Sequence, residues 1–133
     1  MKFPALKTIF YVEDDPNIQN LVRMSLEDIG GFEVTVCSSG YEALEMIKNH
    51  NPDLFLLDFM MPEMDGVELL KKLRKINKEA ERPAIFLTTE VHSQDVLEYS
   101  QLDILGVIAK PFDPISLPEI IKSLWRNHHL RSF

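Results

Sequence analysis

The stretch that most constrains the fold runs from Leu54 to Gly66 and reads LFLLDFMMPEMDG. Its first four residues are large and apolar, which is typical of a β-strand buried on both faces of a parallel sheet. The strand ends at Asp58, and a carboxylate is tolerated there only at an exposed strand tip that faces water or a cation. Pro62 and Gly66 then turn the chain into a new helical pattern. Asp58 is therefore the candidate reactive group.

Length and charge indicate one globular domain that does not bind nucleic acid. A chain of 133 residues suits a single domain, expected over residues 1–133. A hydrophobic content of 45% with 26% charged residues is ordinary for a folded protein. Lys and Arg number 14 against 21 Asp and Glu, which gives a net charge of −7. That balance argues against a phosphate backbone as partner, because such binding relies on Lys and Arg.

Cysteine usage and hydropathy favour a cytoplasmic protein. Cys37 is the only cysteine, so an internal disulfide is impossible and a reducing compartment is the simpler location. We expect Cys37 to be a small core residue. No apolar run is long enough to span a membrane, and the N-terminal residues lack the pattern of a signal peptide.

Strand-like and helix-like segments alternate along the chain. Strands are predicted at residues 8–12, 32–37, 54–58, 84–87 and 106–109, and helices at about 16–29, 40–49, 67–76, 93–100 and 116–128, with a short tail over 127–133. Four strands look fully buried, whereas 32–37 alternates apolar and polar residues and suits a sheet edge. The sequence predicts a doubly wound α/β domain with five helices and a five-stranded parallel sheet in the flavodoxin-like order 2-1-3-4-5.

Several residues receive a purely structural interpretation. Asp15 is expected to cap the first long helix, and Asp65 to form a turn or cap with Gly66. Trp125 is expected to pack on the core. Two sets are expected to be solvated: the basic face Lys71, Lys72, Arg74 and Lys75, and the histidines His50, His92, His128 and His129.

The buried strands each end in a polar residue. Glu13 and Asp14 follow the first strand, Asp58 ends the third, Thr88 follows the fourth and Lys110 the fifth. Because parallel strands end at one edge of the sheet, these side chains should meet at the crevice between the first and third strands.

Three clustered carboxylates repel one another, at about 4 kcal/mol per pair near 4 Å and an effective dielectric of about 20. They must shift their pKa values or bind a cation. An all-oxygen ligand set with open positions suits Mg²⁺. With Lys110 and the hydroxyl of Thr88 placed for phosphoryl oxygens, the cluster points to phosphoryl transfer onto an aspartate.

At this point the chain resembles a receiver domain of two-component response regulators, over about residues 7–127. The segment YVEDDP, with Glu13 and Asp14, resembles the family's acidic pair, and LLDFMMPEMDG, with Asp58, resembles its phosphoacceptor segment. FLTT, with Thr88, resembles the switch hydroxyl, and KPF, with Lys110, resembles the lysine motif. The four motifs occur in the right order, each at the end of the right strand. The resemblance implies a single CheY-like receiver domain.

The resemblance also implies a role for each matching residue. Asp58 would accept a phosphoryl group from a histidine kinase or a phosphotransfer protein. Asp14, Asp58 and the backbone carbonyl of Met60 would ligate Mg²⁺, with Glu13 acting through water. Lys110 would pair with Asp58 and then with the phosphoryl group, and Thr88 would swing to hydrogen-bond that group. The Lys110–Pro111 peptide bond would be cis.

Two positions depart from the family's pattern, and two more are ones where the family varies. Val107 stands where an aromatic switch residue is common, so the signal would pass through loop and helix shifts. Thr89 stands where alanine is common and would narrow access to the phosphoryl group. Met60 and Glu90 occupy positions that tune the lifetime of the aspartyl phosphate, and we hypothesise that Met60 shields it from water.

The resemblance implies a switch rather than a conventional enzyme, since the domain would catalyse only its own phosphorylation and dephosphorylation. Its downstream partner would bind the face of the fourth helix, fifth strand and fifth helix, and a phosphorylation-dependent homodimer is a candidate assembly. One alternative is a Mg²⁺-dependent phosphatase with an aspartyl nucleophile, which would need an acid where Met60 stands. Another is a degenerate receiver that only binds proteins. The kinase, the target, and whether the chain acts alone or as part of a longer protein stay open.

Overall fold

A parallel β-sheet forms the centre of the molecule. The computed structural model describes residues 4–76, 82–89 and 101–130. Within them, five strands pair in parallel in the order β2-β1-β3-β4-β5, as predicted. They are β1 (Thr8–Val12), β2 (Glu33–Cys37), β3 (Leu54–Asp58), β4 (Ala84–Thr88) and β5 (Gly106–Ala109).

The three inner strands carry the apolar runs, because both of their faces are covered. β3 and β4 are buried throughout, and β1 is buried after its first residue. β2 is a half-exposed edge strand, which confirms the prediction from its alternating pattern. The prediction that β5 is fully buried is wrong: Ile108 is buried, but Gly106 and Val107 are half-buried and Ala109 is exposed. The apolar run of β5 suggested full burial, although the predicted strand order 2-1-3-4-5 already places this strand at the other edge of the sheet.

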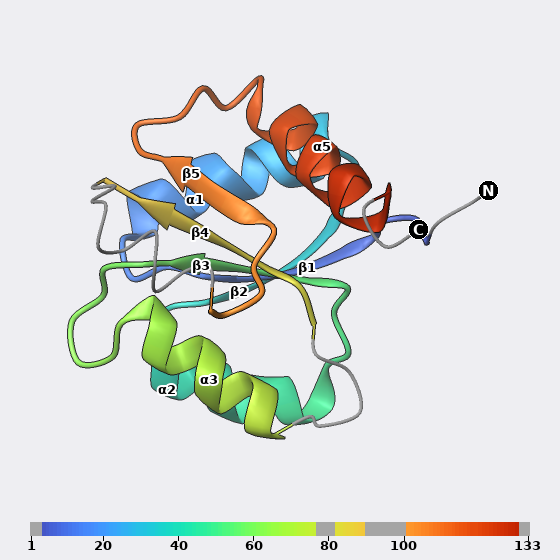
Figure 1. Cartoon of the computed structure of the whole chain (residues 1–133). Coiled ribbons are helices and arrows are strands. Elements are labelled where there is room, and N and C mark those ends of the chain that lie inside the picture. The colour runs from blue at the N-terminus through green and yellow to red at the C-terminus, as the bar shows by residue number, and fades with distance from the viewer. Residues whose placement is uncertain (1–3, 77–81, 90–100, 131–133) are drawn as a thin grey trace.

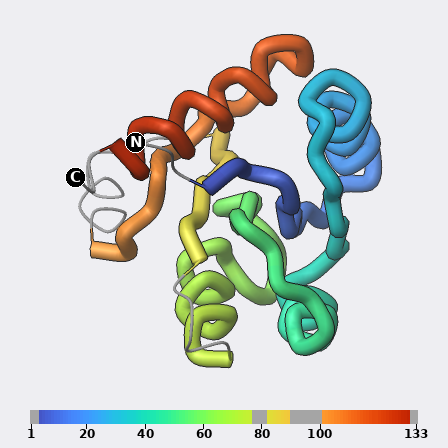
Figure 2. Tube along the Cα trace, turned by 90° about the vertical axis from the view of Figure 1, so that its right-hand side faces the viewer, coloured from blue at the N-terminus to red at the C-terminus, as the bar shows by residue number. Residues whose placement is uncertain are grey.

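Helices cover both faces of the sheet. In the described ranges the α-helices are α1 (Pro16–Met24), α2 (Gly40–Met46), α3 (Gly66–Ile76) and α5 (Leu117–Leu130). Figures 1 and 2 show α1 and α5 on one face and α2 and α3 on the other. The helix predicted at residues 93–100 lies outside the described residues. None of the described helices is long and apolar enough to cross a membrane.

The first helical segment begins as predicted but ends differently. Asp15 caps α1 by accepting a hydrogen bond from the backbone N–H of Asn17, and Pro16 occupies the first turn. The segment predicted as one helix to residue 29 changes at Ser25 into a π-helical turn, Ser25–Ile29. Gly31 then reverses the chain with a φ of +74°, which glycine adopts without steric cost.

The second and third helices are capped by short polar side chains. Ser39 Oγ accepts from the backbone N–H of Glu42 at the start of α2, which continues as a 3₁₀ turn over Ile47–Asn49. Asp65 Oδ1 accepts from the backbone N–H of Glu68, so its predicted capping role is confirmed. A side chain at Gly66 would come within 2.8 Å of the carbonyl oxygen of Asp58. Glycine therefore allows α3 to start against the end of β3.

Arg74 corrects the prediction of a solvated basic face on α3. Lys71, Lys72 and Lys75 are exposed, as expected. The Arg74 guanidinium instead donates to the backbone carbonyl of Leu102, to that of Asp103 at 3.0 Å and to that of Arg82 at 3.3 Å. Arg74 therefore joins α3 to the start of β4 and to the approach to β5.

The last helix is longer than predicted, because α5 reaches Leu130 and includes part of the expected tail. Trp125 packs in the core under α5, as expected, and its indole N–H donates to the carbonyl of Pro4 at 2.8 Å. His129 Nδ1 lies 2.8 Å from the carbonyl of Trp125, and His50 Nδ1 lies 2.7 Å from that of Met46. His50 is exposed and His128 and His129 are half-buried, whereas His92 lies outside the described residues.

Alternation along the strands divides the core into two halves. Phe10 and Val12 pack with the cluster that includes Leu69, Leu70 and Leu73 of α3. Ile9 and Tyr11 pack with the cluster that includes Val22 of α1 and Ile121 of α5. Cys37 is fully buried, and burial raises the pKa of its thiol to about 12, so it is a core residue as predicted.

Candidate functional site

Four of the predicted site residues meet at the carboxyl edge of the sheet. Asp58 is the last residue of β3, and Glu13 and Asp14 directly follow β1 on the neighbouring strand. Lys110 directly follows β5 and reaches across β4 to the same place, where its Nζ lies 3.3 Å from Asp58 Oδ1. The winding of the chain reverses between β1 and β3, which is where open α/β sheets bind their ligands.

Lys110 is the counterion of two buried carboxylates. Its Nζ lies 2.9 Å from Glu13 Oε1, nearer than to Asp58. Glu13 is 1% exposed and Asp58 is 4% exposed. The implied pairing of Lys110 with Asp58 is therefore present, but Glu13 is the closer partner. The Lys110–Pro111 peptide bond is cis, as the resemblance implied.

The pKa directions follow from this crowding. Burial raises the pKa of the Glu13 carboxyl, and its contact with Asp58 raises it further, while Lys110 lowers it; the net shift is upward. Burial by itself lowers the pKa of Lys110. The hydrogen bond to Glu13 and the charge of Asp58 outweigh this effect, so the net shift of the Lys110 pKa is upward. The ammonium group therefore stays charged between its two partners.

The acidic cluster has the composition of a cation site. One carboxylate oxygen from each of Glu13, Asp14 and Asp58 lies within 4.8 Å of the other two. Asp14 is exposed and opens the cluster to solvent, while the other two are buried. Three carboxylates against one nearby ammonium leave negative charge that a divalent cation would neutralise, and hard oxygen ligands fit Mg²⁺. The residues present therefore fit a bound metal ion.

The loop after β3 lies directly against Asp58. The backbone N–H of Met60 lies 3.3 Å from Asp58 Oδ1 and donates to it. The Met60 side chain is 59% exposed. The backbone N–H of Phe59 donates to the carbonyl of Leu87 at 2.8 Å, so the start of this loop is fixed to β4.

Thr88 and its neighbours complete the edge of the site. Thr88 ends β4, is 1% exposed, and its carbonyl accepts from the backbone N–H of Lys110 at 2.8 Å. Thr89 is exposed beside it and lines a cavity of about 300 Å³ with Lys110 and Phe112. Glu90, predicted to tune the phosphoryl lifetime, lies outside the described residues.

Sequence reasoning missed two residues that hold Glu13. The Tyr11 hydroxyl, fully buried, donates to Glu13 Oε1 at 3.3 Å. Burial and the charge of Glu13 raise the pKa of the Tyr11 phenol, so it remains a donor. Gln19 Nε2 donates to the backbone carbonyl of Glu13 and, at 3.1 Å, to Ser38 Oγ. The signal for Tyr11 was its spacing, because residues two apart on a strand share a face.

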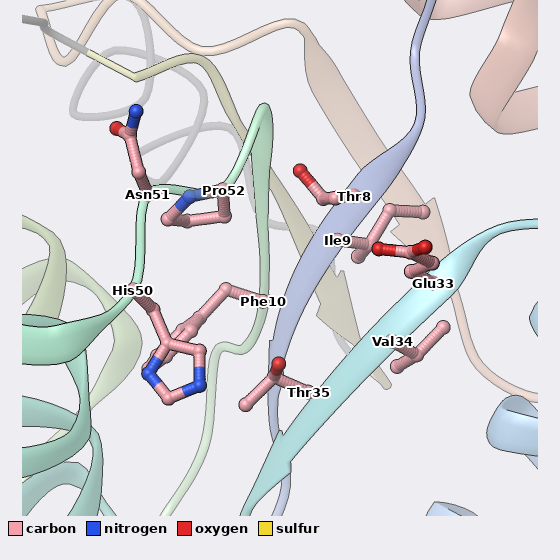
Figure 3. Close-up of a pocket in the computed structure, with 9 residues that line it drawn as sticks. All are labelled: Thr8, Ile9, Phe10, Glu33, Val34, Thr35, His50, Asn51 and Pro52. Atoms are coloured by element: carbon pink, nitrogen blue, oxygen red, sulfur yellow. The ribbon is translucent and has the colours of Figure 1, made fainter.

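Two further cavities differ in their relation to the site. One of about 180 Å³ adjoins the acidic cluster and is lined by Asp14, Ser38, Ser39, Gly40, Tyr41, Met61, Pro62, Glu63 and Met64. The other, of about 160 Å³, is drawn in Figure 3 and is lined by Thr8, Ile9, Phe10, Glu33, Val34, Thr35, His50, Asn51 and Pro52. It lies by the amino ends of β1 and β2, away from Asp58.

The sheet order, the helices on both faces and the carboxylates at the switch point define a doubly wound α/β domain of the CheY-like class. The family model described as "Response regulator receiver domain" matches residues 9–122. The chain therefore belongs to the response regulator receiver family, whose members are the phosphoacceptors of two-component signalling.

Individual relatives agree with this assignment. The chain is 37% identical over 124 residues to a probable transcriptional regulator, ycf29, of Porphyra purpurea, covering 93% of this chain and 59% of that protein. It is 33% identical to the response regulator Rre1 of a Synechocystis strain, covering 88% of this chain and 51% of that protein. The chain thus spans between half and three fifths of the length of these relatives.

Solved structures show the same fold. The structure of the chemotaxis protein CheY4 of Vibrio cholerae aligns with a TM-score of 0.82 at 29% identity, covering 90% of this chain and 99% of that one.

Proposed function

We propose that Asp58 is the phosphoacceptor of a single receiver domain, with a core of about residues 7–127. The observation that carries the proposal is the position of Asp58, at the tip of a fully buried strand, 3.3 Å from Lys110 and within a cluster of three carboxylates. A carboxylate in that position is costly unless it has charge partners and a reaction to perform.

The residues around Asp58 suit phosphoryl transfer from a phosphohistidine. Mg²⁺ would be held by Asp14, Asp58 and the Met60 carbonyl, with Glu13 acting through water, and it would neutralise charge on the phosphoryl oxygens. A carboxylate oxygen of Asp58 attacks phosphorus, the phosphorus–nitrogen bond breaks, and the imidazole leaves and takes up a proton. The Lys110 ammonium moves from Glu13 and Asp58 to the phosphoryl oxygens, and the Thr88 hydroxyl donates to them.

The proposed output is a change in a protein-binding surface. On the proposed face, Ile120 of α5 and Ile115, which lies just before α5, are exposed and line a groove of about 530 Å³. Val107 of β5 is half-buried. It stands where many family members carry an aromatic residue that rotates on phosphorylation, so we propose that this chain transmits the signal without such a rotation. We propose that a histidine kinase or phosphotransfer protein donates to the site, in the cytoplasm, and that a downstream protein or a second copy of the chain binds this face.

The domain acts as a switch that catalyses only its own phosphorylation and dephosphorylation. A phosphatase using an aspartyl nucleophile is less well supported, because an exposed methionine stands two residues after Asp58 where that chemistry needs an acid.

The test is incubation with acetyl phosphate, with and without Mg²⁺, followed by intact mass measurement. We expect a gain of one phosphoryl group that requires Mg²⁺ and is lost in Asp58→Asn. Asp65→Asn is the matched control, since Asp65 is exposed and caps α3, and it should still gain the group. No gain with any phosphodonor would contradict the proposal and favour a receiver that only binds proteins.

A further inference from the structure

A fully buried tyrosine contacts the same carboxylate oxygen as the site lysine. The Tyr11 hydroxyl lies 3.3 Å from Glu13 Oε1, and Lys110 Nζ lies 2.9 Å from that same atom. The other oxygen of this carboxylate, Oε2, lies 3.3 Å from the backbone N–H of Asp15. Glu13 therefore accepts hydrogen bonds from three different donors, of which only Lys110 is charged.

The contact between Tyr11 and Glu13 is a consequence of strand geometry. Side chains two residues apart on a strand point to the same face, and Tyr11 packs with Ile9 on the side covered by α1 and α5. Glu13 continues the pairing of β1 with β2, because its backbone N–H donates to the carbonyl of Cys37 at 3.0 Å. The phenol therefore points along the strand toward the carboxylate, and its buried hydroxyl obtains the partner it needs.

We propose that Tyr11 is a positioning residue that holds the Glu13 carboxylate in place for cation binding, both while Lys110 contacts the same oxygen and after Lys110 moves away. The inference rests on the proposed function, in which Lys110 transfers to the phosphoryl oxygens. Once Lys110 has left, Tyr11 and the Asp15 amide still supply one donor to each oxygen of Glu13. If the Tyr11 hydroxyl is also removed, Glu13 Oε1 loses both of the donors described above. The Glu13 carboxylate would then be free to rotate away from the bound cation.

The test is Tyr11→Phe, which keeps the buried ring and removes only the hydroxyl. Isothermal titration calorimetry with MgCl₂ should give Tyr11→Phe a Mg²⁺ dissociation constant at least threefold higher than that of the unaltered protein. With acetyl phosphate, the Mg²⁺ concentration for half-maximal phosphorylation should rise by the same factor, while the rate at saturating Mg²⁺ changes less than twofold. Thr35→Val, which removes a half-buried hydroxyl from β2 at the cavity away from Asp58, is the control and should leave the dissociation constant unchanged.

A double-mutant cycle shows whether Tyr11 acts through Glu13. In a Glu13→Ala background, the carboxylate that Tyr11 positions is gone. There, Tyr11→Phe should change the Mg²⁺ dissociation constant by less than about 1.5-fold, which is within experimental error. An unchanged constant in Tyr11→Phe alone, or an equal increase in both backgrounds, would overturn the inference while leaving the proposed function intact. An unaltered protein that binds no Mg²⁺ would overturn both, and the first titration shows which case holds.

Discussion

The ammonium group of Lys110 balances two carboxylates that have almost no contact with solvent. Its Nζ lies 2.9 Å from Glu13 and 3.3 Å from Asp58, and its own side chain is 10% exposed. Two carboxylates in so little water repel each other strongly when the shared cation is removed. The stability of the folded domain is therefore linked to a residue proposed to act on the phosphoryl group.

Replacing Lys110 with methionine tests this link. We expect Lys110→Met to lower the free energy of unfolding by about 3 kcal/mol in EDTA, because it leaves buried charges unpaired. Urea unfolding followed by circular dichroism measures the change. Lys72→Met is the control, because the ion pair of Lys72 with Glu68 spans 3.4 Å at the surface and should contribute less than about 0.5 kcal/mol. Equal effects of the two substitutions would contradict the expectation.

The positions of the candidate site residues were predictable where strand ends alone determine them. Asp58, Asp14, Glu13 and Lys110 each follow an apolar run, and parallel pairing places such residues at one edge. The preference of Lys110 for Glu13 could not be predicted, because it depends on distances that differ by less than 1 Å.

At the scale of elements, Arg74 shows how a surface pattern can conceal a structural contact. Three of the four basic residues near the end of α3 are exposed, and their sequence does not distinguish Arg74 from the others. Arg74 differs because its position on the helix faces the backbone of residues 102 and 103. The carbonyl oxygens of these two residues accept hydrogen bonds from its guanidinium. A planar group with five donors can serve several carbonyls together.

Removing this contact should loosen the joint between α3, β4 and β5. We expect Arg74→Ala to lower the free energy of unfolding by about 2 kcal/mol, because hydrogen bonds to charged groups contribute about 1.5–3 kcal/mol. Arg74→Lys should recover less than half of the loss, since an ammonium cannot reproduce the fork of the guanidinium. Thermal and urea unfolding measure both variants.

Lys75→Ala provides the matched control on the next residue of the same helix, which is exposed. It should stay within about 0.5 kcal/mol of the unaltered protein. A loss in Lys75→Ala as large as that in Arg74→Ala would show that the helix surface as a whole, rather than the carbonyl contacts, sets the stability.

The other element-level differences have local causes. The change of α1 into a π-helical turn accompanies a hydrogen bond from Ser25 Oγ to the carbonyl of Pro114, 89 residues away in the sequence. A contact at that separation leaves no periodic signal. The extension of α5 to Leu130 likewise accompanies contacts that a sequence pattern does not show. The indole of Trp125 donates to the carbonyl of Pro4, and His129 Nδ1 lies 2.8 Å from the carbonyl of Trp125.

For the whole molecule, the sheet order was predictable because short crossovers and buried strands admit few arrangements. The same order explains why the acidic cluster forms, and the cluster connects metal binding to global stability. Glu13, Asp14 and Asp58 come from two neighbouring strand ends, so a cation bound between them would oppose their separation on unfolding.

We therefore expect Mg²⁺ to stabilise the folded state. At a concentration one hundred times its dissociation constant, a ligand that binds only the folded state adds about 2.7 kcal/mol. The urea midpoint should rise with MgCl₂ and return to its original value with EDTA. Asp14→Asn should remove most of the increase, whereas Asp28→Asn, which changes an exposed acid in the π-helical turn, should retain it. Equal stabilisation of both variants would place the cation elsewhere.

The contact of Trp125 with Pro4 has a practical optical consequence. Figure 1 shows α5 running back from the carboxyl edge of the sheet. The sole tryptophan, Trp125, donates to Pro4 just before β1, whereas Asp58 ends β3 at the other end of the strands. Its emission spectrum should follow the contact between α5 and the residues before β1 rather than events at the acidic cluster. Spectroscopic titration of this protein with metal or phosphodonor would therefore require a dye or a fluorinated amino acid introduced near the loop after β3.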